Sequence, residues 1–279
     1  MKSKKIVLSY IFSMLAFTKL NFFNFLWFVK VMENQIIQVR EGNVPIIVPE
    51  SIFVFAPHPD DELLSCGGTI LKYRKLGSKI TVVAITKGKG GYTKKLERDD
   101  IIEKRKHELE VVKEMLDCEL IEMGMDEIDV KRETIATFTQ LLRTQKTQVI
   151  FMPHPSDVHR THRKLSIVLK EALYHAVTGK AYGGGDEVYR PLGVFFYESP
   201  SCKFQFVQNS IFVYVNISEY WNQKIEIFNK AYSSQAEMLT RVLKWAEATA
   251  ILRGFEIEQE KAECFIPYTE YAPLRIILH

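Results

Sequence analysis

The chain of 279 residues has few cysteines, and their positions exclude two kinds of site. The four cysteines, at positions 66, 118, 202 and 264, form no CxxC pair, so the sequence predicts neither a zinc ribbon nor a thioredoxin-type redox centre. Scattered cysteines of this kind fit a reducing compartment. Residues 87–91 lack the GxxxxGK[ST] spacing of a phosphate-binding loop. The sequence also has no internal repeat and no low-complexity tract.

The chain has little excess charge outside its amino terminus. It carries 37 basic and 34 acidic residues, but residues 1–31 hold five lysines and no acid. The rest of the chain therefore has 32 basic residues against 34 acidic ones, a formal charge of −2. A nearly neutral domain lacks the basic surface of a nucleic-acid-binding protein, so we expect no nucleic-acid partner.

Residues 1–31 form a hydrophobic amino-terminal segment with three interpretations. Apolar runs cover residues 6–17 and 22–29, and Lys19 lies between them. Because a membrane span needs about 20 nearly uninterrupted apolar residues, a membrane-associated helix over residues 6–31 is one interpretation. A secretory signal without a clear cleavage site is the second, and an extension ahead of a natural start at Met32 is the third. We expect a cytoplasmic protein, with membrane contact through residues 6–31 as the alternative.

Strand-like and helical patterns alternate from residue 51 onward, which predicts an α/β fold. We expect a Rossmann-like, doubly wound, mostly parallel sheet flanked by helices, in a single domain over residues 32–279. Strand-like patterns occupy residues 51–56, 79–85, 119–123, 148–152, 193–198 and 211–217. Helical patterns occupy residues 62–76, 97–116, 131–145, 162–177, 219–232 and 234–252. A glycine-containing loop is expected over residues 178–192. A homo-oligomer is compatible with this sequence.

Polar side chains gather where the first predicted strand ends. Residues 55–62 read Phe-Ala-Pro-His-Pro-Asp-Asp-Glu, directly after an apolar run. Open α/β sheets bind their ligands at the carboxyl ends of the strands. Carboxylates as crowded as those of Asp60, Asp61 and Glu62 repel one another unless a cation or a proton lies between them. The sequence therefore predicts a metal site here.

A second polar cluster follows the apolar run 149–152. Residues 153–162 read Pro-His-Pro-Ser-Asp-Val-His-Arg-Thr-His. His159 and His162 are one helical turn apart, as are His58 and Asp61, so each pair can face a common point. Two histidines and one aspartate with an open fourth position are the ligand set of a catalytic zinc. A lone histidine is more often an ordinary core or surface residue, but four of the seven histidines fall in these two clusters.

These two motifs resemble the signatures of the LmbE-like/PIG-L family of zinc-dependent N-acetyl-sugar deacetylases. Residues 57–62 match [A/P]HPDDE, and residues 154–162 match HPxDxHxxH. The resemblance runs from about residue 50 to 268. Weaker matches are Arg105 with Glu108, Asp126, Ser234 with Gln235, Arg253 with Gly254, and Ala262 with Glu263.

The resemblance implies a role for each residue of the motifs. It implies one Zn²⁺ per chain, with the ligands His58, Asp61 and His162. It implies Asp60 as the general base and His159 as the imidazole that steadies the tetrahedral intermediate or protonates the leaving amine. The implied substrate contacts are Arg105 and Asp126. The implied supporting residues, behind the ligands, are Glu62, Asp157 and His154.

The chain departs from the family pattern at two positions. Thr161 stands just before the last histidine of the second motif, where many members carry an acid, and Asn216 stands where an aspartate is usual. A threonine can support neighbouring histidines only weakly. Neither position is an implied zinc ligand, so the departures bear on rate and substrate more than on the type of reaction.

The implied reaction is zinc-dependent hydrolysis of the N-acetyl group of an N-acetylglucosamine-type sugar or conjugate, by metal-activated water. The expected partner is therefore a small N-acetylated sugar. Three alternatives are hydrolysis of another amide on the same fold, a metal-dependent phosphoesterase, and a zinc-dependent sugar-binding protein. In the phosphoesterase, Asp60, Asp157 and His154 would hold a second metal. Metal stoichiometry and acetate release distinguish these alternatives.

Overall fold

The structure is a computed structural model that describes residues 37–41, 44–89, 98–178, 188–207, 210–232 and 236–269. The chain divides into two compact units, Met1–Ile37 and Gln38–His279, and the second unit holds the α/β fold. The segment 1–31, most of the loop 178–192, and Ser234 with Gln235 lie outside the described residues. Within the described ranges, no helix is both long enough and apolar enough to cross a bilayer.

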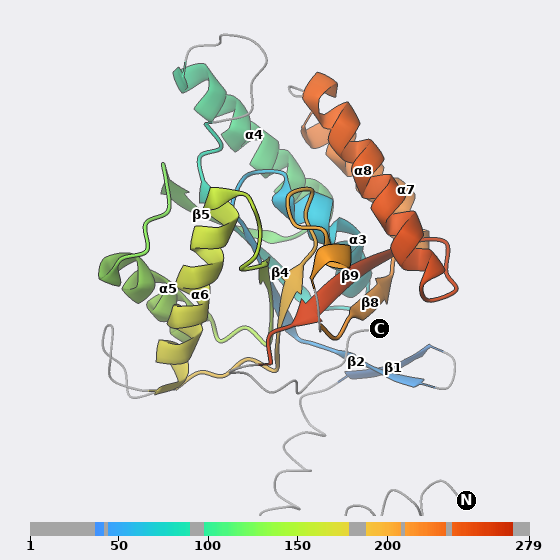
Figure 1. The fold of residues 1–279 in the computed structure, drawn as a ribbon, viewed down its shortest axis with the longest axis horizontal. Helices are drawn as coiled ribbons and strands as arrows, with labels where there is room; N and C mark the ends of the chain where they lie inside the picture. The colour runs from blue at the N-terminus through green and yellow to red at the C-terminus, as the bar shows by residue number, and fades with distance from the viewer. Residues whose placement is uncertain are drawn as a thin grey trace, which may run out of the picture. The chain divides into compact units, whose positions relative to one another are not determined.

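A seven-stranded sheet forms the centre of the second unit, in the order β5-β4-β3-β6-β7-β9-β8 (Figure 1). The strands β5, β4, β3, β6 and β7 pair in parallel, and β9 runs antiparallel to both β7 and β8. The parallel strands are β3 (Ser51–Ala56), β4 (Lys79–Thr86), β5 (Glu119–Met125), β6 (Val149–Pro153) and β7 (Gly193–Tyr197). The other two are β8 (Val213–Asn216) and β9 (Ala262–Pro267). A separate two-stranded sheet pairs β1 (Ile37–Glu41) with β2 (Val44–Val48).

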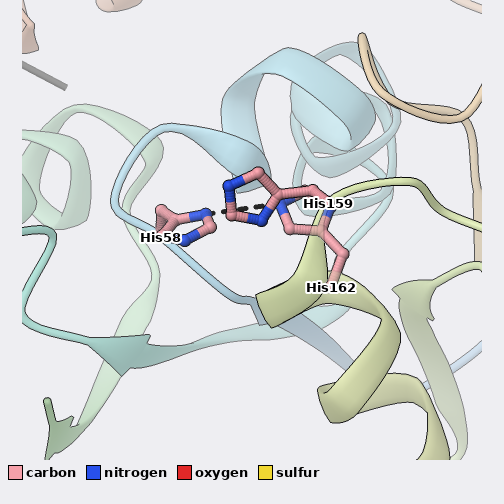
Figure 2. Close-up of side chains that lie close together, drawn as sticks. All are labelled: His58, His159 and His162. Atoms are coloured by element: carbon pink, nitrogen blue, oxygen red, sulfur yellow. Dashed lines mark hydrogen bonds between the residues drawn. The ribbon is translucent and has the colours of Figure 1, made fainter. Parts of the chain in front are cut away.

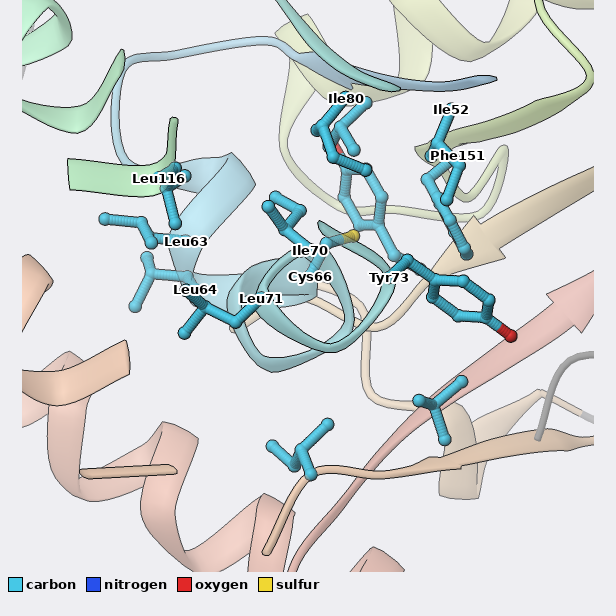
Figure 3. Close-up of a cluster of buried hydrophobic side chains, with 14 of the residues drawn as sticks. Ile52, Leu63, Leu64, Cys66, Ile70, Leu71, Tyr73, Ile80, Leu116 and Phe151 are labelled. Atoms are coloured by element: carbon cyan, nitrogen blue, oxygen red, sulfur yellow. The ribbon is translucent and has the colours of Figure 1, made fainter. Parts of the chain in front are cut away.

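Helices cover both faces of the large sheet. Successive residues of each strand point to opposite faces, so apolar side chains of one strand are buried on both. On one face, Ile52 and Val54 of β3 pack with residues from α3, α4, α7 and α8 (Figure 3). On the other face, Phe53 and Phe55 pack with residues from α5 and α6. The helices are α3 (Asp61–Lys75), α4 (Arg98–Leu116), α5 (Arg132–Gln145), α6 (Arg160–Thr178), α7 (Trp221–Ala231) and α8 (Ala236–Phe255). Two short 3₁₀ helices are η1 (Phe204–Phe206) and η2 (Ser218–Tyr220).

The predicted α/β fold with a mostly parallel sheet is confirmed, but three strands were missed: β1 and β2 of the small sheet, and β9 of the large one. Strand β9 inserts between β7 and β8, although no strand was predicted over residues 262–267. All six of its residues are buried, including Glu263. Glu263 interrupts the apolar pattern by which β9 could have been predicted. The residue that allows Glu263 to be buried lies distant in the sequence. Lys224 of α7 donates to the Glu263 carboxylate at 2.8 Å.

Helix α3 lies close to its neighbours because two glycines replace side chains on its surface. A Cβ atom built on Gly68 would lie 2.6 Å from Cβ of Ile217, and one on Gly67 would lie 3.1 Å from the Lys224 side chain. The first turn of α3 carries Asp61 and Glu62, so this packing also fixes part of the site.

We predict that Gly68→Ala destabilises the domain by about 1–3 kcal/mol, because the added methyl group overlaps a β-branched side chain that cannot move away. Denaturant unfolding of the variant and the wild type measures the difference in free energy. Gly67→Ala is the matched control, since its methyl group meets only side-chain atoms at 3.1–3.2 Å. An equal loss of stability in both variants would contradict the explanation.

Candidate metal centre

The first polar motif folds into a single turn between β3 and α3. Both the backbone N–H and the hydroxyl of Thr86 donate to the carbonyl of Pro57, at 3.1 and 2.8 Å, and so fix the start of the turn. The N–H of His58 donates to Oδ2 of Asp61 at 2.9 Å, and the N–H of Asp61 donates back to the carbonyl of His58 at 3.3 Å. These reciprocal bonds make His58 and Asp61 face one point, as their spacing predicted.

The second polar motif forms the turn between β6 and α6. The carboxylate of Asp157 accepts the N–H of His159 at 2.8 Å, and the carbonyl of His159 accepts the N–H of Arg163 at 3.1 Å. His162 therefore lies in the first turn of α6. Strands β3 and β6 are neighbours in the sheet, with Ile52 opposite Val149, so the two turns meet at the carboxyl ends of adjacent parallel strands.

Three atoms of the two turns that can each donate an electron pair to a metal, called donor atoms below, form a small triangle. Nδ1 of His58 lies 3.1 Å from Oδ2 of Asp61, Nε2 of His162 lies 3.2 Å from the same oxygen, and the two ring nitrogens are 3.3 Å apart. The ring of His159 is 4.7 Å from that of His58 and 4.9 Å from that of His162 (Figure 2). Ligand atoms of the three histidines lie within 4.8 Å of one another, so this cluster can hold a metal ion.

Carboxylates surround the buried imidazole of His162 with negative charge. Nδ1 of His162 is bonded to Oδ2 of Asp157 at 2.9 Å, and the hydroxyl of Ser199 donates to the same oxygen at 2.7 Å. Burial opposes protonation of His162, but Asp61 and Asp157 raise its pKa to about 10. Burial likewise opposes ionisation of Asp157, but hydrogen bonds from His162 and Ser199 lower its pKa to about 2. This environment attracts a cation to the free side of the ring.

The two consecutive aspartates have opposite environments. Burial opposes ionisation of Asp61, yet its bonds with His162 and His58 hold its pKa well below the usual range. Burial and the neighbouring charge of Asp61 raise the pKa of Asp60 well above its usual value, although Arg105 opposes the shift from 3.9 Å away. A partly buried carboxyl group with a raised pKa, beside a cluster of ligand atoms, is suited to accept and return a proton.

Comparisons with known proteins agree with this geometry. Residues 53–173 match the family model described as PIG-L: GlcNAc-PI de-N-acetylase. These residues form a PIG-L family domain. The diacetylchitobiose deacetylase of Thermococcus kodakarensis is 26% identical over 148 residues, which are 48% of this chain and 53% of that protein. The chain thus spans about half the length of this curated relative. The predicted resemblance to the PIG-L family is confirmed.

Solved structures share the fold of this chain. The N,N'-diacetylchitobiose deacetylase from Pyrococcus horikoshii matches with a TM-score of 0.65 and 19% identity, over 78% of this chain and 83% of that chain. The 4-carboxy-2-hydroxymuconate hydratase from Pseudomonas putida matches with a TM-score of 0.66 and 14% identity, over 78% of this chain and 96% of that chain. One of these enzymes is a deacetylase and the other a hydratase, so the fold alone does not decide the reaction.

His154 is part of an aromatic cluster beside the second polar motif. Its ring lies edge-on to Phe196 and Phe204, with centroids 5.1 and 5.8 Å away, and its Nδ1 accepts the N–H of Ser156 at 3.1 Å. Burial lowers the pKa of His154 to about 4, which keeps the ring neutral. His154 therefore supports the turn that carries Asp157, whose N–H donates to the carbonyl of His154 at 3.1 Å.

The expected substrate contacts lie on the other side of the first turn. Arg105 of α4 is buried and donates to the carbonyl of Pro59 at 3.3 Å and to the carboxylate of Glu108 at 3.1 Å. A cavity of about 270 Å³ opens beside Pro59 and Arg105, between α4 and the ends of β4 and β5. Asp126, just after β5, is half exposed and forms ion pairs with Lys87 and Lys89. Neither of these ion pairs joins Asp126 to the histidine cluster.

Two supporting residues of the site had no signal in the sequence. Ser199, just after β7, reaches Asp157, and Tyr232, just after α7, donates its hydroxyl to the carboxylate of Glu62. Each contact joins residues far apart in the chain, so no local spacing could have indicated it. Asn216, which departs from the family pattern, accepts the N–H and the hydroxyl of Ser218 at 3.0 and 2.8 Å and so holds the first residue of η2.

We predict that Asp157→Ala lowers the affinity of the protein for Zn²⁺ by about 10- to 100-fold, because it removes the group that orients the ring of His162. Competition with a coloured chelator measures the affinity. Asp129→Ala is the matched control, since Asp129 is exposed and pairs with Lys164 at 3.2 Å. Equal affinities for the two variants would mean that Asp157 does not orient the ring.

Proposed function

We propose that this protein hydrolyses the N-acetyl group of an N-acetylglucosamine-type sugar or conjugate, using one Zn²⁺ per chain held by His58, Asp61 and His162. The observation that carries the proposal is the triangle of donor atoms, with sides of 3.1, 3.2 and 3.3 Å. Ligands of tetrahedral zinc at 2.0–2.1 Å from the metal lie about 3.3 Å from one another. Two imidazoles and a carboxylate with these separations fit zinc and leave its fourth position open.

The comparisons supply the substrate class of the proposal. The family model is described as a GlcNAc-PI de-N-acetylase, and the curated relative is a diacetylchitobiose deacetylase. Both descriptions name the removal of an acetyl group from an amino sugar. The hydratase with the same fold lies at 14% identity, so its reaction has no support beyond the fold. Deacetylation of an N-acetylated sugar is therefore the reaction that both the site and the relatives favour.

The side chains around the triangle have different roles in the proposed amide hydrolysis. A zinc ion held there by His58, Asp61 and His162 would lower the pKa of a water molecule to about 7 and polarise a carbonyl oxygen. Asp60, next to the ligand Asp61, takes the proton of the attacking water and delivers it toward the leaving amine. His159 is exposed at the edge of the cluster, where its ring can donate a hydrogen bond to the oxyanion or a proton to the amine. Arg105 holds the loop of Asp60 through the carbonyl of Pro59.

The contacts of the second motif favour a single metal over the two metals of a phosphoesterase. The carboxylate of Asp157 already accepts bonds from the ring of His162, the N–H of His159 and the hydroxyl of Ser199. His154 lies against Phe196 and Phe204 in the aromatic cluster. Asp157 and His154, two of the three groups that a second metal would need, therefore already have other contacts.

We predict acetate release from at least one N-acetylated amino sugar. The screen covers N-acetylglucosamine, diacetylchitobiose, and nucleotide- and lipid-linked N-acetylglucosamine, with metal analysis of the same protein. The expected protein holds one Zn²⁺ per chain, loses activity in a chelator and regains it with added Zn²⁺. Activity that persists in the chelator would contradict the metal-dependent mechanism, and the absence of acetate from every sugar would contradict the substrate class.

We predict that Asp60→Asn retains zinc but loses turnover by about 10²–10⁴-fold, the usual contribution of a general base. Asparagine keeps the shape of the side chain and tolerates the same backbone conformation. His162→Ala is expected to lose zinc instead, because it removes one of the three ligands. Metal analysis and acetate release, measured on both variants, separate the two roles. Full zinc occupancy in His162→Ala would place the third ligand elsewhere, with His159 as the neighbouring candidate.

A further inference from the structure

The backbone of Asp60 adopts a conformation that residues other than glycine rarely take. Its φ is 122° and its ψ is −28°, at the residue that precedes the first turn of α3. The carbonyl of Asp60 accepts the N–H of Leu64 at 3.0 Å, which ties one side of the peptide to the helix. A strained backbone of this kind persists only where surrounding contacts hold it in place. The backbone N–H of Asp60 is held by a partner on the other side of the residue.

That partner is the buried carboxylate of Glu62. The N–H of Asp60 donates to Oε2 of Glu62 at 3.1 Å, and the hydroxyl of Tyr232 donates to Oε1 of the same carboxylate. Glu62 is completely buried, and the exposed fraction of Tyr232 is 1%. One oxygen thus holds the backbone of Asp60, and the other is fixed by a residue 170 positions away in the chain.

Tyr232 is itself held rigidly. It follows the last residue of α7, its N–H donates to the carbonyl of Phe228 at 2.9 Å, and its ring contacts that of Phe228 with a centroid distance of 5.2 Å. A carboxylate held at only one oxygen can rotate about its last side-chain bond, because that torsion is broad. With its second oxygen bonded to a fixed hydroxyl, Glu62 presents its first oxygen to Asp60 in one orientation.

We propose that Tyr232, acting through Glu62, is a positioning residue for Asp60. The proposal rests on the proposed function, in which Asp60 is the general base. Without the hydroxyl of Tyr232, the carboxylate of Glu62 loses a fixed orientation, the N–H of Asp60 loses its acceptor, and the backbone of Asp60 relaxes from positive φ. The side chain of Asp60 then moves relative to the donor-atom triangle, while His58, Asp61 and His162 keep their own contacts.

The test is Tyr232→Phe, which removes only the hydroxyl. We expect kcat to fall by about 10- to 100-fold, the usual effect of a small misplacement of a catalytic group, with KM and zinc content within about twofold of the wild type. The matched control is Tyr197→Phe. Tyr197 is also fully buried, and its hydroxyl donates at 2.9 Å to the carbonyl of Phe55, so its removal deletes a comparable hydrogen bond. This control is expected to lose stability but to keep its kcat.

A second pair of variants tests the same contact if Tyr232→Phe fails to fold. Glu62→Gln keeps an oxygen for the N–H of Asp60 and an amide for Tyr232, whereas Glu62→Met has similar length and no acceptor for that N–H. We expect kcat of the glutamine variant to exceed that of the methionine variant by at least about tenfold. Equal kcat values in this pair, or equal values for Tyr232→Phe and Tyr197→Phe, would overturn the proposal.

Crystal structures of the wild type and Tyr232→Phe give a readout that does not depend on activity. We expect the φ of Asp60 to leave the positive region in the variant, while the three donor atoms of the triangle stay in place. An unchanged backbone and carboxylate of Asp60 would overturn the positioning role. A wild type that releases no acetate from any sugar would contradict the proposed function instead, and these structures would then decide the positioning role alone.

Discussion

The parallel pairing of β3 with β6 brings together two polar motifs that lie about a hundred residues apart in the sequence. Ile52 pairs with Val149 and Val54 with Phe151, and both strands then end at the same edge of the sheet. Each strand is followed by a turn whose bonds are local: His58 with Asp61 in one, and Asp157 with His159 in the other. A shift of this register would separate His58 from His162, which are 3.3 Å apart at their ring nitrogens. The cluster therefore depends on the buried apolar residues of the two strands.

The carboxyl-terminal part of the chain supports the same site through buried charges. Glu263 of β9 accepts the N–H groups of Gly68 and Thr69 in α3 at 2.9 and 2.8 Å, and also the ammonium group of Lys224. Because a buried charge is costly without a partner, removal of Lys224 or Glu263 would leave the other uncompensated inside the core. Arg253 of α8 pairs in the same way with Glu198, which follows β7. The residues beyond the matched range 53–173 thus hold the helix that carries Asp61 and Glu62.

Local spacing predicted most of the candidate site, and long-range contacts account for the rest. His58 and Asp61 are three residues apart and bonded within one turn, so their juxtaposition follows from sequence alone. The fold in its alternating part was predictable for the same reason, since strand and helix periods are local. Tyr232 and Ser199 were missed because a single hydroxyl joins each to the site across 170 and 42 residues. Such contacts depend on tertiary packing, as does the burial of Glu263 that concealed β9.

Asp60 and Asp61 are consecutive carboxylic acids that the fold makes chemically different. Asp61 is the first residue of α3 and lies between two imidazoles, which keep it ionised and suited to bind a cation. Asp60 precedes the helix in a strained conformation and lies in a partly buried position that favours its protonated form. Environments that push two neighbouring pKa values apart are how an enzyme separates a ligand from a proton carrier. The difference in pKa depends on the backbone of Asp60. If Asp60 were extended or helical, other groups would surround its carboxyl. In the proposed mechanism, the hydrogen bond from the N–H of Asp60 to Glu62 holds that backbone and so keeps the two roles apart.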